Sequence, residues 1–218
     1  MIKITIAQIN PILGDLTYNS KIILENANLA SSSGSDVLIT PELSLTGYPP
    51  EDLLFREFFL EKVYKNLDNL ILKIKKSAPE LTVIVGHPLA DKNNKHLFNA
   101  ATVFRSGKII GRYGKLELPN YAVFDERRYF DPDGSPFIFD VKGVKCAINI
   151  CEDVWFSRAP KMAKTAGADI ILILNASPFH LDKQNERLAV VKKNVTKIGL
   201  PAVFCNMVGG QDELIFDG

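Results

Sequence analysis

The chain has 218 residues, of which 46% are apolar and 23% charged, and its formal net charge is +1. This is the composition of an ordinary soluble globular protein, and one large domain is the expected organisation. The near-neutral charge argues against nucleic acid or a membrane surface as a partner, because both usually require clustered lysine and arginine.

Strand-like and helical patterns alternate over residues 1–90. Short apolar runs predict strands, and apolar residues spaced three or four apart predict helices. In chain order the segments are a strand at 2–9, a helix at 17–30, a strand at 36–40, a helix at 57–76 and a strand at 81–85. Gly86-His87-Pro88 is expected to end the last of these strands. The alternation indicates parallel strands joined by helices.

Hairpins then interrupt the alternation. Ser106-Gly107 and Lys142-Gly143 each separate two apolar runs, which predicts two antiparallel strand pairs. The strands of these pairs are 98–104 with 108–113, and 137–141 with 144–151. Between the pairs, residues 114–130 form a long, aromatic and charged segment without a regular pattern. Ordered loops of this length are more often functional than not.

The last segments return to helices and strands. They are a helix at 159–166, a strand at 169–175, a helix at 184–198, a strand at 202–206 and a hairpin at 209–216. The second of these helices is expected to bury the face that carries Leu188, Val191, Val195 and Ile198. Because no closing helix or polar tail follows the hairpin, we expect residues 1–218 to be one domain of a longer protein. The whole pattern predicts an α/β fold with mixed parallel and antiparallel strands.

Cys151 differs in its setting from the other two cysteines. Cys146 and Cys205 lie inside apolar strands and fit the commonest fate of a free cysteine, a small buried hydrophobe. Cys151 ends its strand and is followed by Glu152 and Asp153. Enzymes of α/β type usually carry their chemistry at such carboxyl ends of strands, so Cys151 is a candidate nucleophile. Three cysteines cannot all pair within one chain, and no segment predicts a secretion signal, so a reducing cytoplasm is expected.

A thiol nucleophile needs a base or a cation beside it, and the sequence leaves two choices open. The three histidines, His87, His96 and His180, lie in turns and loops that single none of them out, although a spatial Cys-His pair stays open. The alternative is a glutamate base with a lysine. Glu42 and Lys115 each follow an apolar strand, and strands running the same way would bring Glu42 and Cys151 to one rim.

Metal and phosphate sites have no support in the sequence. It contains no CxxC pair and no histidine pair at ligand spacing, so no metal is expected. It contains neither GxGxxG nor GxxxxGK[ST], so no phosphate-binding glycine loop is expected.

Four motifs together give the chain a family resemblance. They are residues 41–54, which include Tyr48-Pro49-Pro50-Glu51-Asp52, and residues 115–130, 149–155 and 175–179. The chain resembles the nitrilase, or carbon–nitrogen hydrolase, superfamily over essentially all 218 residues. More narrowly, it resembles the amino-terminal glutaminase domains of glutamine-dependent NAD+ synthetases. The resemblance implies a four-layer α-β-β-α sandwich with mixed sheets.

The resemblance also implies a role for each site residue. Glu42 is then the general base, Lys115 the cationic stabiliser, Cys151 the nucleophile and Glu126 an auxiliary glutamate. Tyr121, Ser177 and Lys183 fall where the family holds glutamine, and the backbone N–H of Glu152 would join Lys115 in stabilising the oxyanion. Lys183 departs from those members that carry arginine there, and lysine grips a carboxylate as a point charge rather than bidentately.

The implied reaction is hydrolysis of the glutamine side-chain amide through a cysteine thioester. The ammonia would serve a carboxyl-terminal synthetase domain that uses ATP and Mg²⁺ to amidate nicotinic acid adenine dinucleotide to NAD+. No cofactor is expected in the present chain, and the resemblance implies a homo-oligomer. Two alternatives remain: a free-standing amidase of the same superfamily, and a non-catalytic interaction domain.

Overall fold

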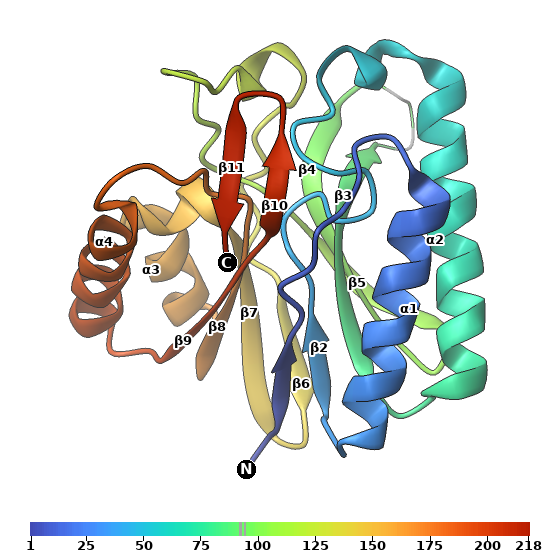
Figure 1. The fold of residues 1–218 in the computed structure, drawn as a ribbon. Helices are drawn as coiled ribbons and strands as arrows, with labels where there is room; N and C mark the ends of the chain where they lie inside the picture. The colour runs from blue at the N-terminus through green and yellow to red at the C-terminus, as the bar shows by residue number, and fades with distance from the viewer. Residues whose placement is uncertain (92, 94) are drawn as a thin grey trace.

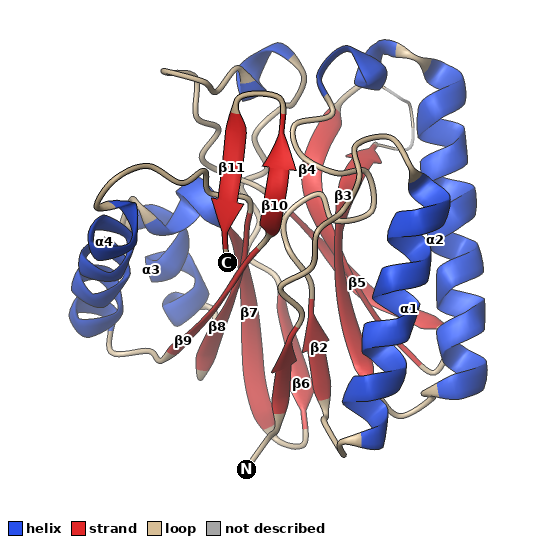
Figure 2. Cartoon of the chain, viewed as in Figure 1, coloured by secondary structure: helices blue, strands red, loops and turns tan. Residues whose placement is uncertain are grey.

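The computed structural model describes residues 1–91, 93 and 95–218, which form four layers in the order α-β-β-α (Figure 1). Helices cover the outer face of each of two sheets, and the sheets pack face to face between them (Figure 2). This confirms the α-β-β-α sandwich with mixed sheets that the family resemblance implies.

The elements of the described residues follow the predicted order. The helices are α1 (Leu16–Ser32), α2 (Glu57–Ser77), α3 (Arg158–Thr165) and α4 (Lys183–Ile198). The strands of the first sheet are β1 (Ile4–Ile6), β2 (Val37–Ile39), β3 (Thr82–Ala90), β4 (Leu97–Arg105) and β5 (Lys108–Gly114). Those of the second are β6 (Ile138–Val141), β7 (Val144–Ile150), β8 (Ile170–Asn175) and β9 (Ala202–Asn206). A separate hairpin pairs β10 (Val208–Gln211) with β11 (Leu214–Asp217). Short 3₁₀ turns occupy Glu51–Phe55 (η1), Glu126–Arg128 (η2) and Cys151–Val154 (η3).

The strand directions bring the ends of several strands to one edge of each sheet. In the first sheet, ordered β1-β2-β3-β4-β5, the first three strands run parallel, and β4 and β5 add antiparallel. β5 therefore runs with β2, so the carboxyl ends of both lie beside the amino end of β4. In the second sheet, ordered β6-β7-β8-β9, only β6 is antiparallel, and β7, β8 and β9 end at a common edge.

The central strands β2 and β8 are apolar on both faces because each face has a buried destination. In β2, Val37 and Ile39 enter the core between the sheets, whereas Leu38 faces α1 and α2. The core between the sheets also contains Ile148 and Ile150 of β7. The outer face of the second sheet packs against α3 and α4. Since both helix layers stay on the outside, the strand ends are left to loops, which carry the polar side chains.

β3 does not end at Gly86-His87-Pro88 as the sequence predicts; it continues to Ala90. Its pairing with β2 stops at Ile84, but its antiparallel pairing with β4 extends from Val83 to Ala90. Proline lacks the N–H that a second ladder needs, so it is tolerated where one side of a strand is unpaired.

The buried face of α4 is the predicted one only in part. Leu188 is 61% exposed, whereas Val191 and Ile198 are half-buried against the second sheet, and the fully buried side chains are those of Arg187 and Asn194. Arg187 bonds to Ser177 and Asp217, and the Asn194 amide donates to the Val154 carbonyl. An apolar pattern misses Arg187 and Asn194 because their polar side chains are buried with partners inside the protein.

None of the described helices is long and apolar enough to cross a bilayer.

Candidate active site

The candidate site lies where the strand ends of the two sheets meet, toward the upper edge of the molecule in Figure 1. Glu42 follows β2 and Lys115 follows β5, both in the first sheet, whereas Cys151 follows β7 in the second. The sequence placed Glu42 and Cys151 on one rim of a single sheet. Instead, two rims face each other, and the base and the thiol come from opposite sheets.

The turn that carries Glu42 is held against β3. Leu45 N–H donates to the Gly86 carbonyl at 3.1 Å, and the Thr40 and Ser44 hydroxyls are 2.8 Å apart. A Cβ atom at Gly86 would lie 2.5 Å from the Pro41 carbonyl oxygen and 2.6 Å from Leu43 N. Glycine is therefore required at position 86, because only a bare backbone lets the Glu42 turn pass this close.

Glu42, Lys115 and Glu126 form a buried charge cluster. Lys115 is fully buried, and its Nζ donates to Glu42 Oε1 and to Glu126 Oε1, each at 2.7 Å. The exposed fractions of Glu42 and Glu126 are 1% and 4%. A buried charge persists only when it is paired and hydrogen-bonded, so each of the three residues depends on the others.

Neutral donors complete the cluster, and the sequence did not identify them. Asn99 Nδ2 donates to Glu42 Oε1 at 2.7 Å and to Glu126 Oε2 at 3.4 Å. The Tyr48 hydroxyl donates to Glu126 Oε1 at 3.0 Å, and Ala176 N–H donates to Glu42 Oε2 at 2.9 Å. One signal in the sequence could have indicated such a donor. Asn99 lies inside the otherwise apolar run that forms β4, and a buried amide needs hydrogen-bond partners.

Cys151 begins η3 in a left-handed backbone conformation, with φ of 43°. The Asp153 carboxylate fixes this turn because its Oδ2 accepts the N–H of Ile150 at 2.8 Å. Asp153 Oδ1 accepts the N–H groups of Leu116 and Glu117 at 3.0 and 2.9 Å. Asp153 therefore ties the turn of Cys151 to the segment that follows Lys115.

The electrostatics of the cluster oppose a free thiolate. Burial and the Glu42 carboxylate raise the pKa of the Cys151 thiol well above its usual value, and Lys115 acts in the opposite direction. Burial also works against the charge of Lys115, but Glu126 and Glu42 outweigh it and raise the lysine's pKa well above its usual value. The thiol therefore stays protonated until a base takes its proton as it reacts.

Burial raises the pKa of Glu126 to about 7, from an ordinary value of 4.5, against the opposing pull of Lys115. The folded protein therefore holds this proton more tightly than the unfolded chain, and stability falls as pH rises from about 4.5 to about 7. Glu126→Gln has no carboxyl group here, so it lacks this loss of stability with rising pH. The difference in unfolding free energy, variant minus wild type, should therefore rise by on the order of 3 kcal/mol between pH 5 and pH 8, as chemical denaturation would measure.

Glu80→Gln is the matched control, because it removes an exposed carboxylate that precedes the amino end of β3, at the end of the sheet opposite to the cluster. An equal pH trend in wild type and Glu126→Gln would contradict the assignment of the raised pKa to Glu126.

The histidines are engaged elsewhere, which argues against a Cys-His pair. His87 is buried, its Nδ1 donates to the Pro88 carbonyl and its Nε2 accepts from Thr102. Burial lowers its pKa to about 4, so the ring is neutral. His96 contacts Asp131, and His180 contacts the Leu181 carbonyl. In the described part of the chain, no three His, Cys, Asp or Glu side chains gather as a metal ion would require.

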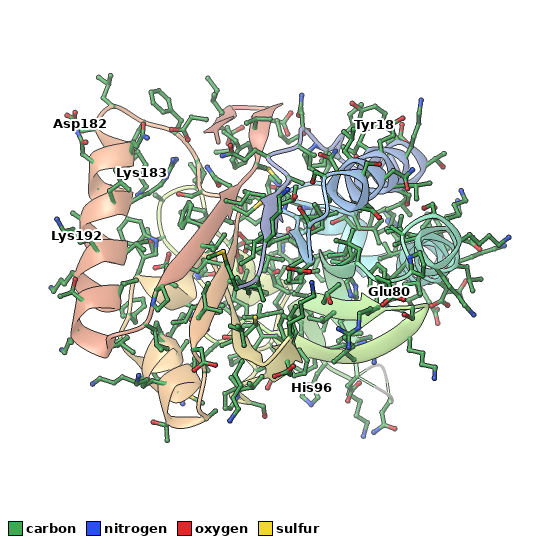
Figure 3. The ribbon with its side chains drawn as sticks, turned by 90° about the horizontal axis from the view of Figure 1, so that it is seen from below. Tyr18, Glu80, His96, Asp182, Lys183 and Lys192 are labelled. Carbon is green, nitrogen blue, oxygen red and sulfur yellow. The ribbon has the colours of Figure 1, made fainter. Side chains whose placement is uncertain are left out.

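The predicted substrate residues lie in two loops, which carry Tyr121 and Ser177, and at the start of α4, which begins at Lys183. The Tyr121 hydroxyl donates to both oxygens of Glu152, at 3.1 and 3.2 Å, and the residue is 54% exposed. Lys183 lies on the side of α4 that faces the sheets (Figure 3), with Nζ 4.2 Å from the centre of the Trp155 ring. Ser177 is buried, and its Oγ accepts from Arg187 Nε at 3.1 Å. Tyr121 and Lys183 thus flank the turn that begins at Cys151, and Ser177 follows Ala176, which bonds Glu42.

The four-layer fold and the buried cysteine, glutamate and lysine at its rim define a hydrolase of the α-β-β-α class. The chain belongs to the carbon–nitrogen hydrolase family, which matches residues 3–218.

Relatives and solved structures agree with this assignment. A glutamine-dependent NAD(+) synthetase from Thermotoga maritima is 40% identical over an alignment of 219 positions that covers 100% of this chain and 37% of the relative. One from Xanthomonas campestris is 41% identical, over 100% of this chain and 39% of the relative. The structure of such a synthetase from Acinetobacter baumannii, in complex with adenosine diphosphate, matches with a TM-score of 0.92 at 34% identity, over 100% of this chain and 40% of that one. An amidase from Nesterenkonia, at a TM-score of 0.87 and 20% identity, covers 100% of this chain and 80% of its own, and shares the fold. The chain thus spans about two fifths of the length of the curated relatives it matches.

Proposed function

We propose that this chain is a glutaminase domain that hydrolyses the side-chain amide of glutamine through a thioester on Cys151. The observation that carries the proposal is the buried cluster in which Lys115 Nζ lies 2.7 Å from both Glu42 and Glu126. It stands at the rim where Cys151 begins its turn. The relatives that match the whole chain bear the name glutamine-dependent NAD(+) synthetase, which favours glutamine as the amide.

The hydrogen bonds single out one oxygen of Glu42 as the base. Oε1 accepts from both Lys115 Nζ and Asn99 Nδ2, which occupies its two lone pairs. Within the described residues, Oε2 accepts only the N–H of Ala176, so one of its lone pairs is open. Glu42 Oε2 therefore takes the thiol proton as sulfur attacks the amide carbon.

Lys115 supplies charge where the oxyanion develops. Its ammonium has three protons, and among the described residues two are donated to Glu42 and Glu126, which leaves one for substrate. The N–H of Glu152 lies at the start of η3, where backbone donors have no partner within the turn itself. Donors aimed at such an oxygen typically contribute about 3 kcal/mol each in the transition state.

Two half-reactions complete the cycle. In the first, the carbon–sulfur bond forms and the carbon–nitrogen bond breaks, and Glu42 passes the thiol proton to the nitrogen, so that ammonia leaves. In the second, water attacks the thioester, Glu42 takes a proton from the water and returns it to sulfur. The products are glutamate, ammonia and the regenerated thiol.

Tyr121, Ser177 and Lys183 are proposed to hold glutamine. Lys183 carries the positive charge that a substrate carboxylate needs, and the Trp155 ring and Glu186 hold its ammonium in place. Tyr121 lies beside Glu152 at the turn of Cys151, where it can cover the reacting thiol.

Arg187→Met tests how the Ser177 loop is held. Arg187 Nη2 donates to Asp217 at 2.7 Å and to the Ser177 carbonyl at 3.0 Å, and its Nε donates to Ser177 Oγ. Removing this donor set frees the loop, so the KM for glutamine should rise about tenfold or more, with a smaller change in kcat. Steady-state kinetics would measure both, and thermal unfolding would report the lost ion pair.

Lys192→Met is the control for this change. Lys192 is exposed on the outer side of the same helix (Figure 3) and should leave KM unaltered. A wild-type KM in Arg187→Met would remove Arg187 from the substrate-holding network.

The wider activity that we propose involves a second domain. The ammonia would pass to a synthetase domain of the same protein, where ATP and Mg²⁺ support amidation of nicotinic acid adenine dinucleotide. We further propose that the protein acts in the cytoplasm as a homo-oligomer and that this chain itself requires neither metal nor cofactor.

The decisive experiment measures glutamate and ammonia release from glutamine, and maps a glutamine-like chloroketone onto the protein by mass spectrometry. We expect stoichiometric release and a single adduct on Cys151. Hydrolysis of other small amides in preference to glutamine would favour a free-standing amidase. No turnover together with an adduct on Cys146 or Cys205 would overturn the proposed function.

A further inference from the structure

Asn99 touches every charged member of the cluster around Lys115. It is fully buried near the amino end of β4, at the edge of the sheet where the site is built. Its side-chain amide donates to Glu42 Oε1 at 2.7 Å and to Glu126 Oε2 at 3.4 Å. Its backbone carbonyl accepts the N–H of Lys115 at 2.8 Å.

The orientation of the Asn99 amide follows from its partners. Both are carboxylates that accept from Lys115, so the nitrogen must face them. The other end of the amide, Oδ1, is buried and finds no partner among the described residues. A buried acceptor without a partner is unfavourable, and such groups in native proteins call for an explanation. An apolar residue of similar shape would avoid the unpaired oxygen, so the amide nitrogen must serve a purpose.

We propose that Asn99 is a positioning residue whose single amide group holds Glu42 and Glu126 in place, so that Glu42 Oε2 stays open toward the thiol. The inference rests on the proposed function for its kinetic consequence, but not for the geometry. Without the donor, Glu42 Oε1 has one lone pair open, and nothing favours Oε2 over Oε1 as the proton acceptor. The two carboxylates would also share Lys115 as their only common donor among the described residues.

The donor also stabilises the ionised form of the carboxylates, so its loss should favour the protonated form. The groups that face this part of the site, from all elements around it, are Glu42, Tyr48, Lys115, Glu126, Cys151 and Glu152. Of these, Glu42 and Glu126 contact the Asn99 amide directly, and Lys115 links the two carboxylates. Removing Asn99 should therefore delay deprotonation of the base until higher pH.

Asn99→Leu and Asn99→Asp separate this role from a purely structural one. Leucine keeps the approximate shape and removes both donors. Aspartate keeps the shape closely, but it presents oxygen to two carboxylates and can donate only while protonated. Asn19→Leu is the matched control, because Asn19 is equally buried and its amide bonds only backbone groups of Ile12 and Leu45.

Two readouts in the intact protein make the test. The first is the pH dependence of Cys151 alkylation by iodoacetamide, followed by peptide mass spectrometry, which needs no glutamine. The second is kcat and KM for glutamine. For Asn99→Leu we expect the alkylation curve to move about one unit toward higher pH. We also expect kcat to fall about 10- to 100-fold, with KM within about twofold of wild type. Asn99→Asp should keep activity only at low pH, where the introduced carboxyl group is protonated and can donate a hydrogen bond.

Each result decides one question. Wild-type alkylation curves in both Asn99 variants would overturn the proposal, even if glutamine is hydrolysed, and the proposed function would stand. A shifted curve in a protein that does not hydrolyse glutamine would uphold the role of Asn99 and remove the proposed function. If Asn99→Leu fails to fold, as circular dichroism would show, Asn99→Asp decides alone. A shifted curve in Asn19→Leu would assign the effect to general loosening and overturn the proposal.

Discussion

Cys151→Ala is expected to lower glutaminase turnover by on the order of 10⁵-fold or more, down to the background rate. Alanine has no nucleophile, and no other thiol can take its place. Cys146 is buried in β7, and Cys205 Sγ is held 3.5 Å from the Ala7 carbonyl. Burial raises the pKa of both thiols above the ordinary value, which keeps them protonated and unreactive. The measurement is glutamate release over hours, with adduct mass as a second readout.

The controls for this result are Cys146→Ala and Cys205→Ala. Each should lose some stability, because a buried side chain becomes smaller, but each should keep the wild-type adduct and turnover. Cys151→Ser is the sharper contrast. It keeps a hydroxyl in the same turn, yet a hydroxyl is a far weaker nucleophile than a thiol, so it should bind glutamine without turning it over. Turnover by Cys151→Ala above a tenth of the wild-type rate would remove Cys151 as nucleophile.

Lys115→Met is expected to affect both catalysis and stability. Methionine follows the course of the lysine stem but leaves Glu42 and Glu126 buried without a cation. Breaking a buried pair in this way costs about 3–5 kcal/mol, because a charge loses its partner. Loss of the ammonium from the oxyanion should also reduce kcat by on the order of 10³-fold. Steady-state kinetics and urea denaturation would measure the two effects.

The stability loss in Lys115→Met should depend on pH in a defined direction. Burial and mutual repulsion raise the pKa of the orphaned carboxylates, so folding favours their protonated forms. The variant should therefore be closest to wild type near pH 5 and fall increasingly behind as pH rises toward 8. Lys142→Met removes a surface lysine paired with Asp36 and is the control, because an exposed pair contributes little. A deficit in Lys115→Met that is constant with pH would contradict the role of Lys115 as counterion.

Most of the fold was predictable because local patterns and core packing agree. In α1, the predicted helix contains Ile23, Ala27 and Ala30 on one face, and these residues are buried against α2 and the sheet. The hairpin turns at Ser106-Gly107 and Lys142-Gly143 were predictable because each contains a glycine between two apolar runs. Two-residue hairpin turns favour positive φ, which glycine adopts readily, and all four residues take positive φ in the structure. Prediction failed at Pro88 and at Leu188 of α4, because tertiary contacts that an apolar pattern does not show decided the outcome. The next strand, β4, supplies the ladder that carries β3 past Pro88, and Arg187 of α4 pairs with Asp217, 30 positions away.

The site was predictable only in part, and for a different reason. Cys151 could be singled out by its place at a strand end, but nothing local to Glu42 or Lys115 distinguishes them from surface charges. The family resemblance proposed them, and the structure brings Glu42, Lys115 and Glu126 into contact. Asn99 escaped notice because its role depends on a carboxylate 57 positions away.

Because the site is assembled from the edges of two sheets, its activity depends on the packing of one sheet against the other. Glu42, Asn99 and Lys115 are carried by one sheet, and Cys151 and Ala176 by the other. A compact state that keeps its helices and strands but loosens the core between the sheets would retain its far-ultraviolet signal, while the base lost its register with the thiol. On mild denaturation, catalytic activity should therefore be lost at a lower denaturant concentration than the far-ultraviolet signal. On refolding, the return of activity should report when the two sheets pack against each other.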